Sequence, residues 1–196
     1  MTRNFRADKI PRPRIDEERL QNFVRPPLFM EIGAGQGLHA IRYALPHPQH
    51  HLIAIERTKE KYEKLHRRFV RHGSPANLLP MQADAIAVVA HFLSEESLEG
   101  IFLLYPNPEP KNPQKRWFRM PFMTFLVKRL RPGGEIVLAT NISAYADEAL
   151  EFHRQHGLKL KEDIVLPGDF PPRTHFEKKY LKRGDICRNL VFTRDR

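Results

Sequence analysis

Three glycines in one short segment are the first residues whose spacing could do chemistry. Gly33, Gly35 and Gly37 lie in the segment Glu31-Ile32-Gly33-Ala34-Gly35-Gln36-Gly37. Glycines let a backbone turn sharply and approach a ligand closely. The dinucleotide fingerprint needs its third glycine three residues after the second, and here Leu38 occupies that position. The spacing therefore argues against a pyrophosphate cradle and favours a ligand without phosphates.

Acidic side chains accompany this loop where an adenosyl ligand would need them. Glu31 precedes the glycines and can face the cationic end of an amino-acid-like ligand. Glu56 closes the next apolar run, where a carboxylate can accept hydrogen bonds from ribose hydroxyls. Asp84, followed by Ala85, comes after a third run and can meet an adenine amino group. Glu56 and Asp84 could each instead lie at a helix N-terminus, but together with Glu31 they predict an adenosyl site.

Two further segments could form the opposite wall of the site. Asn107 lies among three alternating prolines in the segment from Tyr105 to Trp117, and such prolines stiffen a loop. Asn141 ends a later apolar run. Near the C-terminus the segment Thr174-His175-Phe176-Glu177 precedes a basic cluster. Asn107 could also be a simple turn former between prolines.

Alternating apolar runs and amphipathic stretches place these residues on a defined scaffold. Strands are expected at 28–32, 51–55, 78–82, 101–105, 135–140, 159–166 and 186–193, and helices at 38–45, 58–72, 83–92, 115–130 and 144–156. This order predicts an α/β fold with a mostly parallel sheet, helices on both faces and an antiparallel C-terminal strand. Ligands in such sheets bind outside the carboxyl ends of the strands.

The chain length and composition fit one domain. Of the 196 residues, 1–26 form a basic, proline-containing stretch that we expect to be a flexible arm with a short helix near 16–24. Residues 27–196 are expected to form a single domain. The chain has one cysteine, Cys187, and no apolar run long enough for a membrane helix, which favours a reducing, cytoplasmic location. The histidines show no metal-ligand spacing, so no metal site is expected.

The charge favours a polyanionic partner. The chain carries 33 Lys and Arg against 23 Asp and Glu, a formal net charge of +10. A protein this basic should attract nucleic acid, with salt weakening the attraction. The alternative is a solvated surface without a charged partner.

At this point the chain resembles the bacterial tRNA (guanine-N7) methyltransferases, which are Rossmann-like class I enzymes. That family carries an E-I-G-x-G-x-G loop, an F-P-D-P-W-P-K-K-R-H loop, an A-T-D segment and a T-x-F-E-x-K segment. All four are matched in order and spacing from about residue 29 to residue 193. The resemblance implies S-adenosyl-L-methionine as cofactor, tRNA or another structured RNA as partner, and a monomer or weak homodimer.

The resemblance also implies roles by position. The adenosylmethionine contacts would be Glu31, Gly33, Gly35, Gly37, Glu56, Asp84, Ala85 and Asn107. The substrate side would comprise Lys111, Asn141, Thr174, Phe176 and Glu177. We expect RNA phosphates to meet Lys115, Arg116, Arg119, Lys178 and Lys179. Trp117 could stack on the target base, whereas Phe118 and Tyr105 are expected to pack in the core.

The chain departs from the family at two substrate-side positions. Asn107 stands where the family has its proposed catalytic aspartate, and Asn141 replaces a second aspartate. Guanine N7 carries no proton, so its methylation needs alignment rather than a general base. An asparagine keeps an acceptor oxygen but loses the charge that would stabilise the methylated base, a handicap of about 1–3 kcal/mol.

Three alternatives to a tRNA guanine-N7 methyltransferase stay open at this stage. One is a methyltransferase whose substrate has changed to another nucleotide or a small molecule. Another is a non-catalytic RNA-binding protein that kept the fold and the charge. A nicotinamide-dependent oxidoreductase is disfavoured by the glycine spacing.

Overall fold

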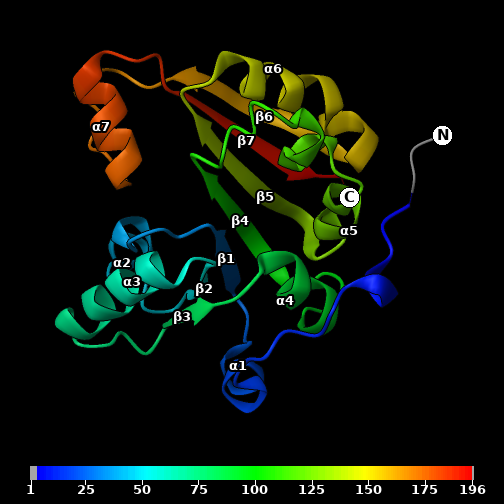
Figure 1. Cartoon of the computed structure of the whole chain (residues 1–196), viewed down its shortest axis with the longest axis vertical. Helices are drawn as coiled ribbons and strands as arrows, with labels where there is room; N and C mark the ends of the chain where they lie inside the picture. Colours follow the sequence, from blue (N-terminus) through cyan, green and yellow to red (C-terminus); the bar gives the residue numbers. More distant parts are fainter. Residues whose placement is uncertain (1–3, 196) are drawn as a thin grey trace.

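A single mixed sheet organises the chain in the computed structural model, which describes residues 4–195 (Figure 1). Its strand order is β3-β2-β1-β4-β5-β7-β6. The strands are β1 (Leu28–Ile32), β2 (His51–Glu56), β3 (Leu78–Gln82), β4 (Leu98–Leu104), β5 (Leu130–Thr140), β6 (Leu158–Val165) and β7 (Arg188–Arg194). Strands β1 to β5 pair in parallel, whereas β7 is antiparallel to both β5 and β6. The fold class predicted from the sequence is confirmed.

Helices cover both faces of this sheet. The α-helices are α1 (Glu17–Phe23), α2 (Leu38–Ala44), α3 (Lys59–Arg71), α4 (Ala85–Phe92), α5 (Phe122–Val127), α6 (Ser143–Phe152) and α7 (His175–Arg183). Short 3-10 helices are η1 (Ala7–Lys9), η2 (Pro113–Lys115), η3 (Trp117–Arg119) and η4 (His153–His156). No helix among the described residues is long and apolar enough to cross a membrane.

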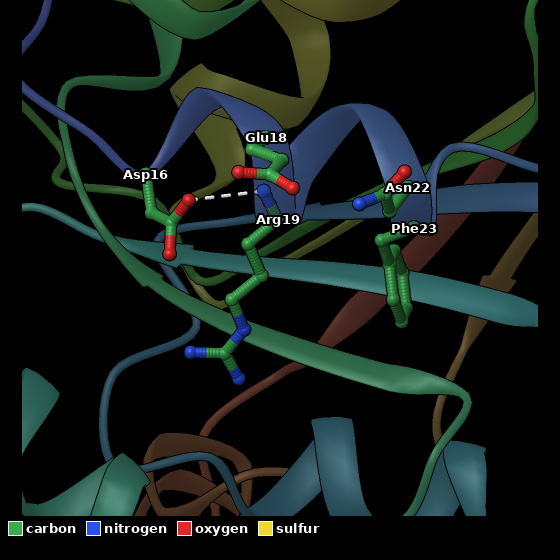
Figure 2. A pocket seen from close by; sticks show the side chains of 5 residues that line it. All are labelled: Asp16, Glu18, Arg19, Asn22 and Phe23. Carbon is green, nitrogen blue, oxygen red and sulfur yellow. Dashed lines mark hydrogen bonds between the residues drawn. The ribbon is translucent and has the colours of Figure 1, made fainter.

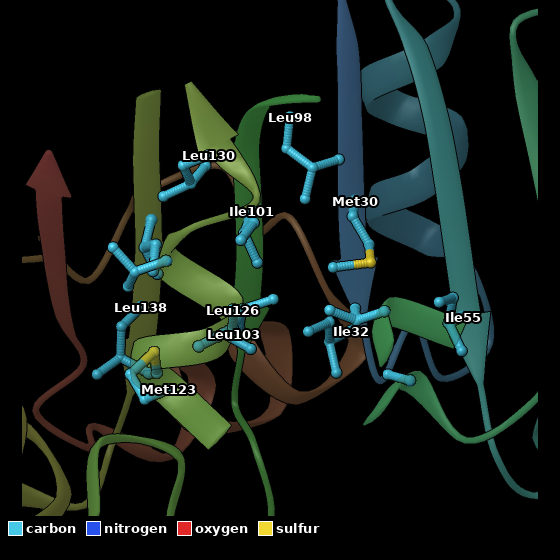
Figure 3. Close-up of a cluster of buried hydrophobic side chains, with 14 of the residues drawn as sticks. Met30, Ile32, Ile55, Leu98, Ile101, Leu103, Met123, Leu126, Leu130 and Leu138 are labelled. Atoms are coloured by element: carbon cyan, nitrogen blue, oxygen red, sulfur yellow. The ribbon is translucent and has the colours of Figure 1, made fainter. Parts of the chain in front are cut away.

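The alternation of side chains along the strands divides the core into two clusters. On β1, Met30 and Ile32 belong to one cluster, which also contains residues of α1, α4, α5 and α6 (Figure 3). Phe29 points to the opposite face and packs with the second cluster, which contains residues of α2 and α3. Burying one such side chain contributes about 1.5–3 kcal/mol. Packing in both clusters holds the strands in register. Because β1 to β4 are parallel, their carboxyl ends lie along one edge of the sheet.

The helix expected over 115–130 was wrong in its extent. The structure has two short 3-10 turns, η2 and η3, followed by α5, which begins after Pro121. A proline cannot donate the backbone hydrogen bond of a helix interior, and it disfavours the helical conformation of the preceding residue. Pro121 therefore splits the predicted helix.

Helix α7 was not predicted. Thr174 caps it, because the Thr174 side chain accepts a hydrogen bond from the Glu177 N–H at 3.0 Å. The spacing Thr-x-x-Glu is a capping-box signature that could have revealed this helix. Gly184, in the left-handed conformation, ends it.

The N-terminal segment lies against the domain. Leu20 of α1 is buried in the first cluster, and the Phe5 ring is 5.0 Å from the Phe122 ring and 4.9 Å from the Phe125 ring. The ring of His91 on α4 hydrogen-bonds the carbonyl of Ile10 at 2.8 Å. The expected flexible arm over 1–26 is therefore corrected for the described residues, which are held by apolar packing. The short helix expected near 16–24 is confirmed as α1.

Phe5→Ala should reveal this packing. The substitution removes two aromatic contacts from a half-buried site, and we expect the free energy of unfolding to fall by about 1–3 kcal/mol. Urea unfolding followed by circular dichroism measures the change. The exposed neighbour Lys9 supplies the control, because Lys9→Ala should leave the transition midpoint in place. A Phe5→Ala midpoint equal to that of the wild type would show that the segment is free in solution.

Candidate functional site

The glycine loop joins β1 to α2 at the carboxyl edge of the sheet. Gly33, Gly35 and Gly37 all adopt left-handed backbone conformations, with φ of +77°, +57° and +74°. The Gly33 N–H donates to the carbonyl of Ile55 on β2 at 2.9 Å. A Cβ at Gly37 would come within 2.2 Å of Leu65 Cδ1 on α3. The loop therefore requires glycine for its conformation and, at Gly37, also for space.

Glu56 fixes the shape of this loop from the end of β2. Its buried carboxylate accepts hydrogen bonds from the Gly35 N–H at 2.9 Å, the Thr58 N–H at 2.8 Å and the Thr58 hydroxyl at 2.7 Å. An ionised carboxylate has about four acceptor sites, so it can still accept from a ligand hydroxyl. Glu56 therefore combines a structural role with the binding role expected from the sequence.

Glu31 offers a buried acceptor that the protein leaves without a hydrogen bond. Its Oε2 atom lies 3.1 Å from Nδ1 of His39 on α2, but the two atoms are not aligned for a hydrogen bond. Both side chains are buried. A buried carboxylate oxygen without a donor costs free energy, so its presence beside a glycine loop indicates a place for a ligand cation.

Asp84 lies after β3, as the sequence predicted, and caps helix α4. Its Oδ1 atom accepts a hydrogen bond from the Ile86 N–H at 2.8 Å. Asp84 is exposed, whereas the next residue, Ala85, is buried. One oxygen of Asp84 is therefore committed to the helix.

These residues come from the ends of three adjacent strands. Glu31, Glu56 and Asp84 belong to β1, β2 and the loop after β3, which are neighbours in the sheet. The strand order reverses at β1 and β4, and ligands bind at such a switch point. The unpartnered oxygen of Glu31 fits an ammonium group, and the glycine backbone permits close approach. The arrangement fits an adenosyl ligand with a cationic amino-acid end.

A hollow on α1 is separate from this site. It is lined by Asp16, Glu18, Arg19, Asn22 and Phe23, and Asp16 accepts a hydrogen bond from the Arg19 N–H at 3.0 Å (Figure 2). No residue of the glycine loop borders it.

The proline loop leaves the sheet at the end of β4 in a strained conformation. Tyr105 and Glu109 have positive φ values of +53° and +45°, which residues with a side chain rarely adopt. Asn107 lies exposed between them, and its Oδ1 atom accepts a hydrogen bond from the Glu109 N–H at 3.2 Å. Strain of this kind persists only where the surroundings impose it, and it is common at functional sites.

Arg116 holds this loop and is not available to RNA. It is buried, its Nε donates to the Pro108 carbonyl at 2.7 Å, and its Nη1 lies 2.6 Å from Oε1 of Glu148 on α6. Arg119 approaches the other oxygen of Glu148 at 3.0 Å. The expected contact of Arg116 with RNA phosphates is therefore corrected, because Arg116 is buried and paired with Glu148, whereas contact of the half-buried Arg119 with RNA stays a prediction. No sequence signal pairs residues that lie 32 positions apart.

Trp117 also belongs to the scaffold. Its ring packs 5.9 Å from that of Phe122, and its backbone N–H donates to the Tyr145 hydroxyl at 3.0 Å. Phe118 is buried in the first cluster, as expected. Tyr105 packs in a third apolar cluster with Leu181 and Cys187, and burial raises the pKa of Tyr105.

Glu177 lies inside the protein rather than at the substrate side. Its side chain is fully buried and accepts hydrogen bonds from the Arg173 N–H at 2.6 Å, the Arg173 guanidinium at 2.7 Å and the Tyr105 hydroxyl at 3.0 Å. The direct substrate contact expected for Glu177 is therefore corrected. Glu177 orders Arg173, which the sequence analysis missed and which also bonds Asn189 Oδ1 at 2.8 Å. Phe176 lies exposed beside this network.

Asn141 is paired with a carboxylate that the sequence analysis also missed. Its Nδ2 donates to Oδ2 of Asp185, just before β7, at 3.0 Å. A hydrogen bond from Arg183, supported by that from Asn141, holds the pKa of Asp185 below its ordinary value. A carboxylate is therefore present at the end of β5 although neither Asn107 nor Asn141 carries one, and Arg183 pairs with it through both of its oxygens.

The remaining predicted phosphate contacts are exposed. Lys111, Lys115, Lys178 and Lys179 point to solvent, and in the described part of the chain no carboxylate lies within ion-pair distance of them. Their contact with RNA stays a prediction.

Comparison with known proteins supports a methyltransferase. Residues 25–188 match a family described as "Putative methyltransferase". The tRNA (guanine-N(7)-)-methyltransferase of Nitrosomonas eutropha is 33% identical over 177 residues, which cover 86% of this chain and 76% of the relative. That of Bordetella parapertussis is 33% identical over 172 residues, covering 86% of this chain and 67% of the relative.

Solved structures share the fold. The 16S rRNA methyltransferase KamB superposes with a TM-score of 0.73 at 19% identity, covering 93% of this chain and 94% of that chain. A 16S rRNA (adenine(1408)-N(1))-methyltransferase W203A mutant with cosubstrate SAM from Catenulisporales acidiphilia gives 0.66 at 13% identity, covering 93% and 92%. At such low identity these neighbours establish the fold alone.

Gly37→Ala should lower the free energy of unfolding by more than the strain of a left-handed alanine would by itself. Gly73 offers a matched control, because its φ is +79° but no atom lies within 4 Å of an added Cβ. We expect Gly73→Ala to cost about 1–2 kcal/mol of unfolding free energy. Gly37→Ala should cost about 1–3 kcal/mol more, through the clash with Leu65, and should weaken binding of S-adenosyl-L-methionine. Urea unfolding and calorimetry measure both effects, and equal losses in the two variants would contradict this account.

Proposed function

This chain belongs to the tRNA (guanine-N7) methyltransferase family, and we propose that it transfers a methyl group from S-adenosyl-L-methionine to N7 of a guanine in tRNA. The main support is the 33% identity to a tRNA (guanine-N(7)-)-methyltransferase over 86% of the chain. The glycine loop and the unpartnered oxygen of Glu31 supply independent support for the cofactor.

Three carboxylates are suited to hold the cofactor. Glu31 Oε2 would receive the ammonium group of the methionine moiety, because it is a buried acceptor without a donor. Glu56 would accept from the ribose hydroxyls while it keeps the Gly35 N–H in place. Asp84 would meet the adenine amino group with the oxygen that does not cap α4. When bound, the cofactor supplies an electrophilic methyl group on a positively charged sulfur.

The substrate side has to position the base rather than remove a proton. Guanine N7 has a free lone pair, so the protein must align it behind the methyl carbon. Asn107 would accept from the guanine edge, and we propose that Lys111, Thr174 and Phe176 contribute to the same side, as the resemblance to the family implies. Asp185 would offset the positive charge that methylation places on the base, acting beside Asn141.

The molecular setting is also part of the proposal. The net charge of +10 suits a tRNA backbone. We propose that residues 27–196 act as one domain, as a monomer or weak homodimer, in the cytoplasm.

Methyl transfer to unmodified tRNA tests the proposed function directly. The protein is incubated with labelled S-adenosyl-L-methionine and unmodified bulk tRNA, and N7-methylguanosine is mapped in the product. We expect label at a guanine N7. Cofactor binding with salt-sensitive tRNA binding but no transfer would instead support a non-catalytic RNA-binding protein, and transfer to another position would support a changed substrate.

Charge at the substrate side should set the rate of this reaction. Asn107→Asp should raise kcat/KM for tRNA by about ten- to a hundredfold, because a carboxylate stabilises the methylated base better than an amide. Asp185→Asn should lower it, because it removes the carboxylate beside Asn141. Asn112→Asp makes the same charge change elsewhere on the exposed proline loop and serves as control.

The double variant Asn107→Asp/Asn141→Asp distinguishes a guanine-N7 methyltransferase with reduced activity from an enzyme whose substrate has changed. If the wild-type protein shows almost no guanine-N7 activity and the double variant gains it, the substrate has changed. If Asn112→Asp accelerates the reaction as much as Asn107→Asp, a local role for Asn107 is excluded.

A further inference from the structure

Positively charged side chains from three helical segments meet beside the glycine loop. Helix α7 lies over α2 and α3 (Figure 1). Arg42 on α2 donates to the Pro172 carbonyl, Arg68 on α3 lies 2.9 Å from the His175 ring nitrogen, and Lys61 lies 5.9 Å from the Phe176 ring centre. We call this group the basic seam; its members are the cations Arg42, Lys61, Arg68, Arg71 and Lys178, together with the imidazole of His175.

The basic seam has no acidic partners. Within residues 4–195, no carboxylate lies within 4.0 Å of any of its six members. Other cations of α3 do have partners, since Lys64 pairs with Glu60 at 2.6 Å and Lys59 with Glu63 at 4.0 Å. The positive potential of the seam is therefore not cancelled by the protein itself.

Members of the seam repel one another. Burial lowers the pKa of Arg68, and the nearby charges of Arg71 and Arg42 lower it further. Burial also lowers the pKa of His175, with added contributions from Arg68, Lys178 and Arg42. Like charges that the fold holds close together repel one another. A bound anion relieves this repulsion, so the seam favours anion binding.

The seam adjoins the cofactor loop. Arg68 Nε donates to the Gln36 carbonyl of that loop at 2.9 Å. The same side chain therefore contacts both the glycine loop and the first residue of α7. An anion bound to the seam would lie next to the glycine loop.

The extent of the seam fits a polymer better than a single phosphate. Lys61 and Arg71 are ten positions apart on one helix, a rise of about 15 Å. Arg42 and Lys178 extend the group onto α2 and α7. Guanidinium groups pair well with phosphate oxygens because they present parallel donors.

We propose that the basic seam binds backbone phosphates of the tRNA strand that carries the target guanine, an inference that rests on the proposed function. Arg116, which the sequence offered as a phosphate contact, is buried and paired with Glu148, and Arg119 approaches the same carboxylate. In this proposal the basic seam, which lies on the opposite face of the sheet, contacts the phosphates instead. It extends the predicted contact at Lys178 onto α2 and α3, which the sequence analysis did not assign to RNA.

The triple variant Lys61→Gln/Arg71→Gln/Lys178→Gln tests the seam. Within residues 4–195 these three side chains make no hydrogen bond or ion pair, so their loss should spare the fold. The matched control is Arg25→Gln/Lys128→Gln/Arg154→Gln, which removes the same charge from exposed positions before β1, β5 and β6. Binding of unmodified tRNA is measured by filter binding at several salt concentrations.

The expected result is specific to the seam variant. The slope of log affinity against log salt should become shallower by about 2–3, because roughly three phosphate contacts are lost. The tRNA Kd should rise at least tenfold at physiological salt, and the KM for tRNA should rise with it. Binding of S-adenosyl-L-methionine should be retained by both variants, which shows that both are folded.

Failure of the seam and failure of the proposed function give different results. If the seam variant and the control show the same slope and Kd while the wild-type protein methylates tRNA, the seam proposal is wrong and the function stands. If the wild type binds tRNA through the seam but transfers no methyl group, the proposed function is wrong. Absence of tRNA binding by the wild type would overturn both.

Discussion

The hydrogen bonds of the Glu56 carboxylate are the interaction on which the site depends. They join the glycine loop after β1 to the loop after β2, through Gly35 and Thr58. A loop of three left-handed glycines has a large conformational entropy in the unfolded chain, so it needs such a constraint to keep one shape. Gly37 packed against Leu65 supplies a second constraint from α3. The glycine loop is therefore preorganised by the strands and the helix that contact it.

The substrate side is also held in one conformation by contacts within the protein, which here are buried ion pairs. Arg116 with Glu148 holds the proline loop to α6, and Arg173 with Glu177 holds the segment before α7. Leaving a buried charge unpaired costs several kcal/mol, so each pair fixes the loop that carries it. Residues that looked like ligand contacts in the sequence thus act by positioning the strained loop around Asn107.

The sequence could predict the parts of the structure that depend on local patterns. The strands, the glycine loop and the acids at the ends of β1 to β3 follow from apolar runs and from the residues that terminate them. Arg116 was misassigned because its partner Glu148 is 32 residues away, and a contact at that distance leaves no local pattern. The split helix at Pro121 and the capped helix after Thr174 did have local signals. Asp185 had none, because its importance comes from pairing with Asn141 across two strands.

A count of charges cannot say which cations are available to a partner. The excess of ten positive charges is a property of the whole chain, but carboxylates distribute themselves unevenly among the basic residues. Glu148 alone lies within ion-pair distance of two arginines near the proline loop, whereas α3 keeps Arg68 and Arg71 unpaired next to Arg42. After folding, part of the usable positive charge therefore lies at the junction of α2, α3 and α7. A polyanion is attracted where the protein's own acids are absent, and this junction is such a place beside the cofactor loop.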